Sequence, residues 1–343
     1  MTNMPTANAS HQPLPIIDLS AADRGTSART LFHAQLHSAV HEVGFFQLVG
    51  HGVTQDETDG LVSVMREFFA LPDEQRLAID NAHSPHFRGY TRTGDERTRG
   101  RQDWRDQLDI GAERQARPPA PSEPPYWWLQ GPNQWPAALP QLRSAALQWI
   151  DRLSKVAEKL LHEILASVGA DPTFYDGIFG AQAHCHLKLV RYPGGSGDGT
   201  EQGVGVHKDY GFLTLLLQDR VGGLQVQDED GHFNDVPAVP GAFVVNLGEL
   251  LEVATNGYLV ATSHRVVSPP GDTERFSVPF FFNPRLDARV TPLDFPYAAT
   301  APGITQNSDN PLFAEYGYNE LKGKLRAHPV VARTHHPELM TPA

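Results

Sequence analysis

The chain has 343 residues, of which 40% are hydrophobic and 20% are charged, and its 28 Lys and Arg against 40 Asp and Glu give a formal charge of −12. This length suffices for one large domain or two ordinary ones with a core that needs no disulfides. An acidic chain repels phosphate backbones, and the sequence has no cationic amphipathic segment, so we expect no nucleic acid and no membrane surface as a partner.

The sequence contains one cysteine, Cys185, which excludes an internal disulfide and a cysteine-based zinc site. A lone thiol is typical of a reducing compartment, so we expect a cytoplasmic protein. Residues 1–12 lack the basic and apolar regions of a secretory signal, and no apolar run approaches the ~20 residues that span a bilayer. We expect a small-molecule substrate as partner, and a monomer or weak homo-oligomer.

The first part of the chain mixes helices and strands. Hydrophobic periodicity predicts a strand at 14–19, a helix at 26–43, a strand at 45–49 and a helix at 55–71. Residues 81–135 are irregular, with a Pro-rich stretch and one expected strand at 106–110. Long connections of this kind in a compact protein are often functional.

The longest helical pattern covers residues 142–168 and ends at Gly169. Beyond Cys185, short β-type runs alternate with Gly and Pro turns, which is typical of a β-sandwich or barrel. The expected strands are 186–192, 212–217, 224–227, 233–236, 243–246, 264–267 and 276–282, and a last helix is expected at 313–325. We therefore expect a mainly β protein with flanking helices. Its expected segments are a flexible lead at 1–13, an α/β region at 14–135, a long helix and connection at 136–180, a β-core at 181–290 and a C-terminal helix and tail at 291–343.

Three side chains in the β-rich half form a candidate metal site. His207 and Asp209 are two residues apart, a spacing that points side chains to the same side of a strand. His264 follows 57 residues after His207, which leaves room for the chain to return to the same place. Two imidazoles and one carboxylate on one face of a metal leave three positions open. Non-haem Fe(II) uses this arrangement to bind a chelating co-substrate and O₂ together.

A second motif follows 11 residues after His264, where Arg275 and Ser277 share one strand face. The planar fork of arginine binds a carboxylate through two parallel hydrogen bonds, and a serine hydroxyl can supply another. The pair suits the far carboxylate of a dicarboxylic acid whose 2-oxo acid end chelates iron. Each motif alone is common, but their order and spacing in a β-rich half together indicate a functional site.

With these motifs, the sequence resembles the isopenicillin N synthase-like branch of the Fe(II)/2-oxoglutarate dioxygenases. The similar stretches are 14–19, 44–53, 191–193, 207–211, 222–226, 246–249, 263–266 and 274–282. The resemblance implies a double-stranded β-helix, a jelly-roll-like core, with helices packed on one side. It implies that Fe(II) is held by His207, Asp209 and His264. It also implies that 2-oxoglutarate is bound by Arg275, Ser277 and Tyr192, with O₂ as the other co-substrate.

Three features depart from the plant members of that family. Val190 stands where they usually carry Asn, the interval from His264 to Arg275 is about one residue longer, and a Gly-rich loop at 194–205 replaces a Pro- and Cys-containing one. The chain is more similar to the bacterial members, of which the ethylene-forming enzyme is the best-known relative. Ethylene formation is an exceptional outcome, and the resemblance does not extend to it.

Further residues are candidates for contact with the substrate. His186 and Lys188 share one strand face, and Lys188 could meet a substrate or co-substrate carboxylate. Asp95 and Glu96 lie in the region that borders the substrate in the family, where an acidic pair could hold a cationic group. Aromatic residues that could wall the pocket are Phe212, Phe280 and Phe282. The acidic pair favours a small, polar, positively charged metabolite, whereas an aromatic wall would favour an apolar one.

The expected function is an oxygenase that couples decarboxylation of 2-oxoglutarate to succinate and CO₂ with oxidation of a substrate C–H bond. One alternative is an oxidase of the same fold that does not use 2-oxoglutarate, as in isopenicillin N synthase and aminocyclopropane-carboxylate oxidase, because both keep the Arg-x-Ser motif. A non-catalytic β-sandwich is a weaker alternative, because a binding module has no need of open coordination positions. Hydroxylation, desaturation, ring formation and epoxidation all remain open.

Overall fold

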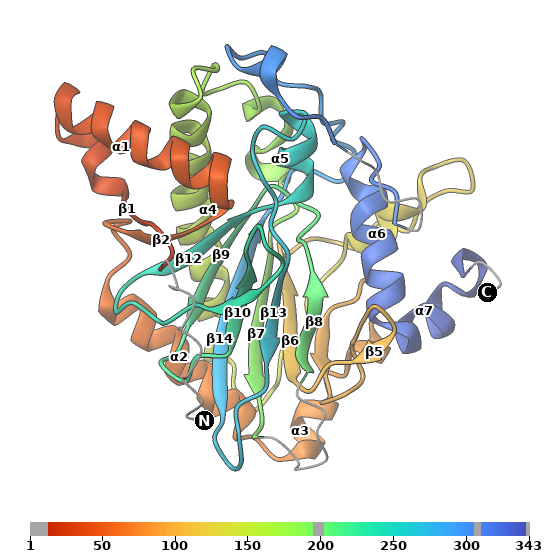
Figure 1. Ribbon diagram of the computed structural model, residues 1–343. Helices are drawn as coiled ribbons and strands as arrows, with labels where there is room; N and C mark the ends of the chain where they lie inside the picture. The colour runs from red at the N-terminus through yellow and green to blue at the C-terminus, as the bar shows by residue number, and fades with distance from the viewer. Residues whose placement is uncertain (1–12, 195–201, 305–309, 341–343) are drawn as a thin grey trace, which may run out of the picture.

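Two β-sheets form the centre of the structure, a computed structural model described over residues 13–194, 202–304 and 310–340 (Figure 1). Within these residues the larger sheet has eight strands, in the order β1-β2-β12-β9-β14-β7-β6-β3, and the smaller has four, in the order β11-β10-β13-β8. The larger sheet comprises β1 Ile16–Asp18, β2 Phe45–Val49, β12 Phe243–Leu247, β9 Leu213–Gln218, β14 Arg275–Phe282, β7 His186–Tyr192, β6 Asp106–Gly111 and β3 Gly89–Thr91. The smaller sheet comprises β11 Phe233–Asp235, β10 Leu224–Gln227, β13 His264–Val267 and β8 Gln202–His207, and β4 Arg97–Thr98 pairs separately with β5 Arg101–Gln102.

The two sheets pack face to face. One buried apolar cluster joins side chains of both, with Phe45 and Val244 from the larger sheet against Val204, Leu224 and Val266 from the smaller one. Neighbouring strands are antiparallel except for β1 and β2, and most neighbours are far apart in the sequence. The expected mainly β, jelly-roll-like core with flanking helices is therefore confirmed.

Helices cover the outer face of the larger sheet (Figure 1). The long helix α4 (Gln141–Ser167) contacts β7, β9 and β14, and it is flanked by α1 (Thr26–Ser38) and α2 (Gln55–Phe69). The predicted helix end is confirmed, because Gly169 has a φ of +76° and the next N–H, of Ala170, donates to the carbonyl of Leu165. The other α-helices are α3 Asp73–Leu77, α5 Glu249–Ala254, α6 Tyr316–Ala327 and α7 Pro329–His335. None of the helices in the described part of the chain is long and apolar enough to cross a membrane.

The structure differs from the predicted elements in several places. The irregular region contributes β3 and β6 to the edge of the larger sheet, so the N-terminal region and the β-core share one sheet. The first helix ends in a π-helical turn at Ala39–Val43. The last helix begins at Tyr316 instead of Phe313, and α7 follows it where a tail was expected. Part of the predicted Gly-rich loop is strand β8, while 195–201 lies outside the described residues.

Packing of α4 against the larger sheet can be tested at Leu160, whose side chain is completely buried. Leu160→Ala should lower the free energy of unfolding by about 2–5 kcal/mol, because it removes apolar contacts and leaves a cavity. Urea denaturation measures the change. Glu158→Ala, on the exposed face of the same helix, is the matched control and should change stability by less than ~0.5 kcal/mol. Equal losses in both variants would contradict the assigned inner face of α4.

Candidate metal and co-substrate site

A pocket of about 530 Å³ lies between the sheets and helix α6. Strand alternation explains its wall, since residues two apart on a strand face the same side. On β7 the residues that line the pocket are His186, Lys188 and Tyr192, and on β14 they include Arg275, Ser277 and Phe281. The intervening residues of the same strands face the helices.

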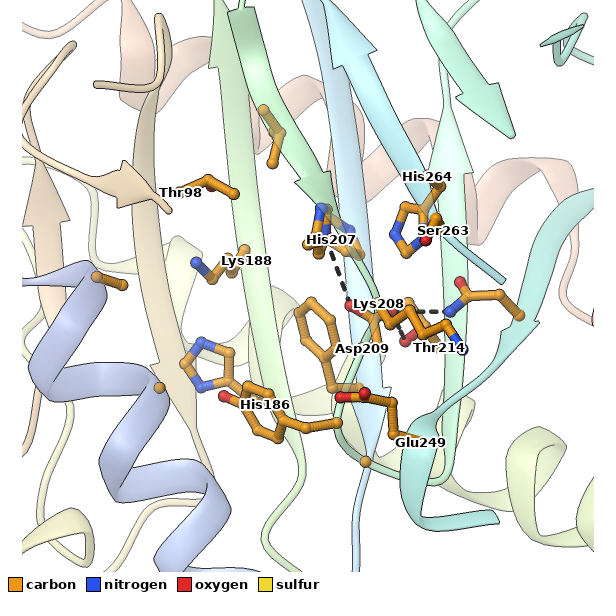
Figure 2. A pocket seen from close by; sticks show the side chains of 18 of the residues that line it. Thr98, His186, Lys188, His207, Lys208, Asp209, Thr214, Glu249, Ser263 and His264 are labelled. Carbon is orange, nitrogen blue, oxygen red and sulfur yellow. Dashed lines mark hydrogen bonds and ion pairs between the residues drawn. The ribbon is translucent and has the colours of Figure 1, made fainter. Parts of the chain in front are cut away.

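The three predicted metal ligands meet at one end of this pocket (Figure 2). His207, the last residue of β8, pairs in register with His264, the first residue of β13, and their ring centroids are 4.2 Å apart. Oδ1 of Asp209 lies 3.6 Å from Nε2 of His207, and candidate ligand atoms of all three residues lie within 4.8 Å of one another. Strand β8 ends at His207, so the turn after the strand brings Asp209 to the site. The alternation of side chains along one strand, which was assumed from the sequence, is not the reason.

Hydrogen bonds fix the orientation of each of these side chains. Nδ1 of His207 donates to the Gly205 carbonyl at 2.8 Å, and Nδ1 of His264 donates to that of Thr262 at 3.2 Å. A carbonyl only accepts, so Nδ1 carries the proton and Nε2 keeps its lone pair for a metal.

The carboxylate of Asp209 is held in the same way by two neighbouring strands. Its Oδ2 accepts hydrogen bonds from Thr214 at 2.6 Å and from Asn246 at 2.8 Å. These bonds occupy one oxygen and leave Oδ1 directed toward His207. The carboxylate therefore presents one oxygen to the place where a metal would bind.

Burial and mutual interaction set the charge of these groups. Burial lowers the pKa of His207, and burial together with the nearby His207 lowers the pKa of His264 to about 4. Burial opposes ionisation of Asp209, but the two histidines and the bonds from Asn246 and Thr214 hold its pKa below the usual value. Two neutral imidazoles and one carboxylate are a donor set that suits Fe(II).

Arg275 supplies an anion-binding group in the same pocket. Its side chain is completely buried, and its Nε and Nη1 have no hydrogen-bond partner among the described residues. Its guanidinium carbon lies 4.7 Å from the ring centroid of Tyr192, its register partner on β7. Ser277 is also buried, beside Val190 in register. Buried donors without acceptors are costly, so the site fits an anionic ligand such as 2-oxoglutarate.

The predicted substrate residues are placed differently from one another. Glu96, His186 and Lys188 line the pocket, whereas Asp95 is exposed and outside its wall. Glu96 is not free for a cation, because its two oxygens each lie 2.8 Å from a cation, Arg105 Nη2 and Lys188 Nζ. The structure therefore does not bring Asp95 and Glu96 together as an acidic pair.

The predicted aromatic wall lies elsewhere. Phe212 and Phe282 pack on Phe179 in the core, with ring centroids 5.2 and 4.5 Å from that ring. Strand alternation explains the difference, since Phe281 faces the pocket and its neighbours Phe280 and Phe282 face the helices.

Helix α6 provides pocket residues that the sequence analysis missed. Glu320, Lys324 and His328 line the pocket and are almost fully buried. Glu320 and Lys324 are four residues apart, which places them on one side of α6, and His328 follows directly after the last residue of the helix. This polar stripe was the available signal, but an amphipathic helix normally turns such a stripe to solvent.

Comparison with known proteins places both halves of the chain in one family. Residues 183–284 match the model of the 2OG-Fe(II) oxygenase superfamily, and residues 14–138 match the model described as non-haem dioxygenase in morphine synthesis N-terminal. The 2-oxoglutarate-dependent dioxygenase frbJ of Dothideomycetidae sp. (strain 11243) is 36% identical over 297 residues, which cover 85% of this chain and 80% of that protein.

A second relative and a solved structure agree with this result. Homoarginine-6-hydroxylase 2-ODD-C23 of Glycine max is 33% identical and covers 76% of this chain and 80% of its own length. The crystal structure of JOX2 in complex with 2OG, Fe and JA has a TM-score of 0.71 and 25% identity, and covers 99% of this chain and 92% of that one. These fungal and plant relatives do not support the expected placement near the bacterial ethylene-forming enzyme.

The bond from Thr214 to Asp209 generates a test of the site. Thr214→Val keeps the side-chain shape but removes the hydroxyl that orients the carboxylate. We expect Mn(II) affinity to fall by roughly 10- to 100-fold, as for other partners of metal ligands. Metal titration by calorimetry measures it. Thr58→Val, whose hydroxyl bonds only its own helix, is the control, and equal affinities in all three proteins would contradict a metal site at Asp209.

Proposed function

The chain belongs to the 2OG-Fe(II) oxygenase superfamily, and we propose that its pocket couples decarboxylation of 2-oxoglutarate to oxidation of a C–H bond in a small-molecule substrate. The reaction consumes O₂ and 2-oxoglutarate and releases succinate and CO₂. The observation that carries this proposal is the convergence of His207, Asp209 and His264 in one pocket with the unpaired donors of Arg275.

In this proposal His207, Asp209 and His264 hold Fe(II). When bound, Fe(II) supplies the redox chemistry by which O₂ oxidises the co-substrate and the substrate. The protein contributes fixed tautomers at both histidines and one oriented carboxylate oxygen at Asp209. Three ligands leave open positions, so co-substrate can bind without displacing a side chain.

Arg275, Ser277 and Tyr192 bind 2-oxoglutarate in this proposal. The guanidinium pairs with the far carboxylate, Ser277 adds a hydroxyl, and the Tyr192 ring packs near the guanidinium. The side chain of Val190, in register with Ser277, has no polar atom that could bond 2-oxoglutarate. Arg275 therefore contributes a larger part of co-substrate binding here than in members with Asn at this position. Relatives named 2-oxoglutarate-dependent dioxygenases, at 36% and 31% identity, favour this function over the same-fold oxidase, and the two unpaired nitrogens of the buried guanidinium are available to its dicarboxylic co-substrate.

Hydroxylation is the outcome we propose for the substrate. Several plant relatives between 30% and 33% identical are named homoarginine-6-hydroxylases, and the solved structure of JOX2 contains JA. The pocket volume is suited to a metabolite of this size. The placement near the bacterial members, expected from three departures from the plant members, is not supported by these relatives and carries no part of the proposal.

Removing a proposed iron ligand tests the catalytic assignment. His264→Ala and Asp209→Ala should each abolish 2-oxoglutarate-dependent succinate release and weaken Fe(II) binding, because two ligands no longer define the site. Succinate is measured by chromatography, and circular dichroism checks the fold. His232→Ala, at a 77% exposed histidine side chain, is the control. Full turnover in the double variant His207→Ala/Asp209→Ala would refute the assignment.

The co-substrate assignment is tested at Arg275. Arg275→Lys keeps the charge but loses the two-pronged geometry, so we expect a loss of about 1.5–3 kcal/mol in 2-oxoglutarate binding. This corresponds to roughly a 10- to 150-fold rise in the KM for 2-oxoglutarate. Arg143→Lys, at an exposed arginine on α4, is the control. If substrate oxidation proceeds without 2-oxoglutarate and is unaffected by Arg275→Lys, the oxidase alternative is correct.

A further inference from the structure

The pocket is positively charged although the chain is acidic. Among the described residues of its wall, nine are Lys or Arg and five are Asp or Glu. Asp209 and Arg275 belong to the proposed metal and co-substrate sites, and setting both aside leaves the same excess of cations. An excess of cationic side chains in a pocket concentrates ligands of negative charge.

Two buried lysines, Lys188 and Lys324, have N–H donors left over once their carboxylate partners among the described residues are counted. Nζ of Lys324 lies 2.9 Å from Oδ1 of Asp109, while Nζ of Lys188 lies 3.7 Å from the same oxygen and 2.8 Å from Oε1 of Glu96. Their side chains are 6% and 10% exposed. An ammonium group has three donors, so these carboxylates do not exhaust either lysine.

The tautomer of His186 increases the number of spare donors. Its Nδ1 lies 2.8 Å from Nη1 of Arg88, and a guanidinium only donates, so Nδ1 accepts. Nε2 therefore carries the proton and donates to Oδ1 of Asp109 at 2.8 Å. Lys324 lies 3.3 Å from this Nε2, but two donors cannot pair. Lys324 is thus left with donors that only another acceptor can use.

His328 at the end of α6 provides a further buried donor. Its Nδ1 accepts from the Asn81 amide at 3.1 Å, so Nε2 carries the proton. This Nε2 has no hydrogen-bond partner within the described chain and lies 3.6 Å from Oε1 of Glu96. Burial lowers the pKa of His328 to about 4, so the ring is a neutral donor. The side chain is only 1% exposed, and an unused donor at this depth calls for an acceptor.

From these contacts we propose that Lys188, Lys324 and His328 form a binding site for a carboxylate group of the substrate. Oε1 of Glu96 lies beside both Lys188 and His328, and Oδ1 of Asp109 lies beside both lysines, so the three donors are neighbours. A substrate carboxylate placed among them would accept hydrogen bonds that no described residue accepts. The substrate class is therefore a small organic acid, which includes amino acids.

The carboxylate site is separate from the proposed co-substrate site but close to the metal ligands. Lys188 and Tyr192 are four residues apart on β7, or about 13 Å along the strand. Figure 2 shows Lys188 beside His207, on the side away from His264. The acid group would be held on the α6 side while another part of the molecule lies near the metal. This inference rests on the proposed function and names its substrate class, replacing the cationic group expected from Asp95 and Glu96.

Matched acids and amides test the site directly. The protein loaded with Mn(II) and 2-oxoglutarate is titrated with acetate, phenylacetate and L-arginine, and with acetamide, phenylacetamide and L-argininamide, while thermal unfolding reports binding. We expect the acids to raise the unfolding temperature and the amides to have little effect. His328→Phe and Lys324→Met should each weaken acid binding by roughly tenfold or more. His328→Gln, which keeps an N–H donor, should retain most of it.

Controls separate this proposal from the proposed function. Lys155→Met, at an exposed lysine on α4, should bind the acids like the wild type. Stabilisation by 2-oxoglutarate alone should persist in every variant, and its absence in the wild type would instead count against the proposed function. Equal effects of acids and amides, or an acid preference unchanged in both His328→Phe and Lys324→Met, would overturn the carboxylate site. No stabilisation by any acid while 2-oxoglutarate still binds would overturn it as well.

Discussion

The buried carboxylate of Asp209 is the group on which the arrangement of the pocket depends. It follows β8 of the smaller sheet, yet its Oδ2 is bonded to Thr214 on β9 and Asn246 on β12 of the larger sheet. Its backbone carbonyl accepts the Glu249 N–H at the start of α5 at 2.7 Å. One residue therefore joins both sheets and a helix. The same bonds leave Oδ1 beside His207, so the packing of the core and the geometry of the proposed metal site are set together.

Strands β7 and β14 divide the molecule into a core and a pocket. Their alternate residues pack against α4 on one side and face the pocket on the other, so polar groups line the pocket without entering the core. Of the β7 residues that face the pocket, Tyr192 lies at the end near Arg275, whereas Lys188 and His186 lie toward α6. The order of residues along one strand thus places the proposed co-substrate group and the proposed substrate group at different ends.

The sequence was sufficient for the fold class and for the grouping of the three candidate metal ligands with Arg275, because these depend on short motifs and their order. It was insufficient where strand register, or contact between residues far apart in the sequence, determines the position of a side chain. Gly203 makes part of β8 read as a loop, but a Cβ there would lie 3.0 Å from the Tyr192 ring, so the glycine permits close approach of the two sheets. A shift of one residue separates Phe281 in the pocket from Phe282 in the core.

Glu96 shows a second limit of sequence reasoning, since its role depends on residues far along the chain. Its nearest cations are Arg105 on the following segment and Lys188 on β7, more than 90 residues away. Considered without Arg105 and Lys188, an acidic residue in this region indicates a cationic ligand. Paired with these two cations, Glu96 is instead a neutralised part of the pocket wall. Charge recognition in a pocket depends on the net charge of the whole cluster, which no single motif reports.

The position of α6 and the recognition of substrate are physically linked through the same charges. Lys324 reaches from α6 to Asp109 on β6, a buried ion pair that must offset the cost of removing both charges from water. Hydrogen bonds from the remaining donors of Lys324 to a bound acid group would offset more of that cost. An acid group bound among Lys188, Lys324 and His328 would contact β7 and α6 at once, and so would favour the state in which α6 is docked. The helix that the sequence presents as a C-terminal appendage is, in this structure, a wall of the pocket.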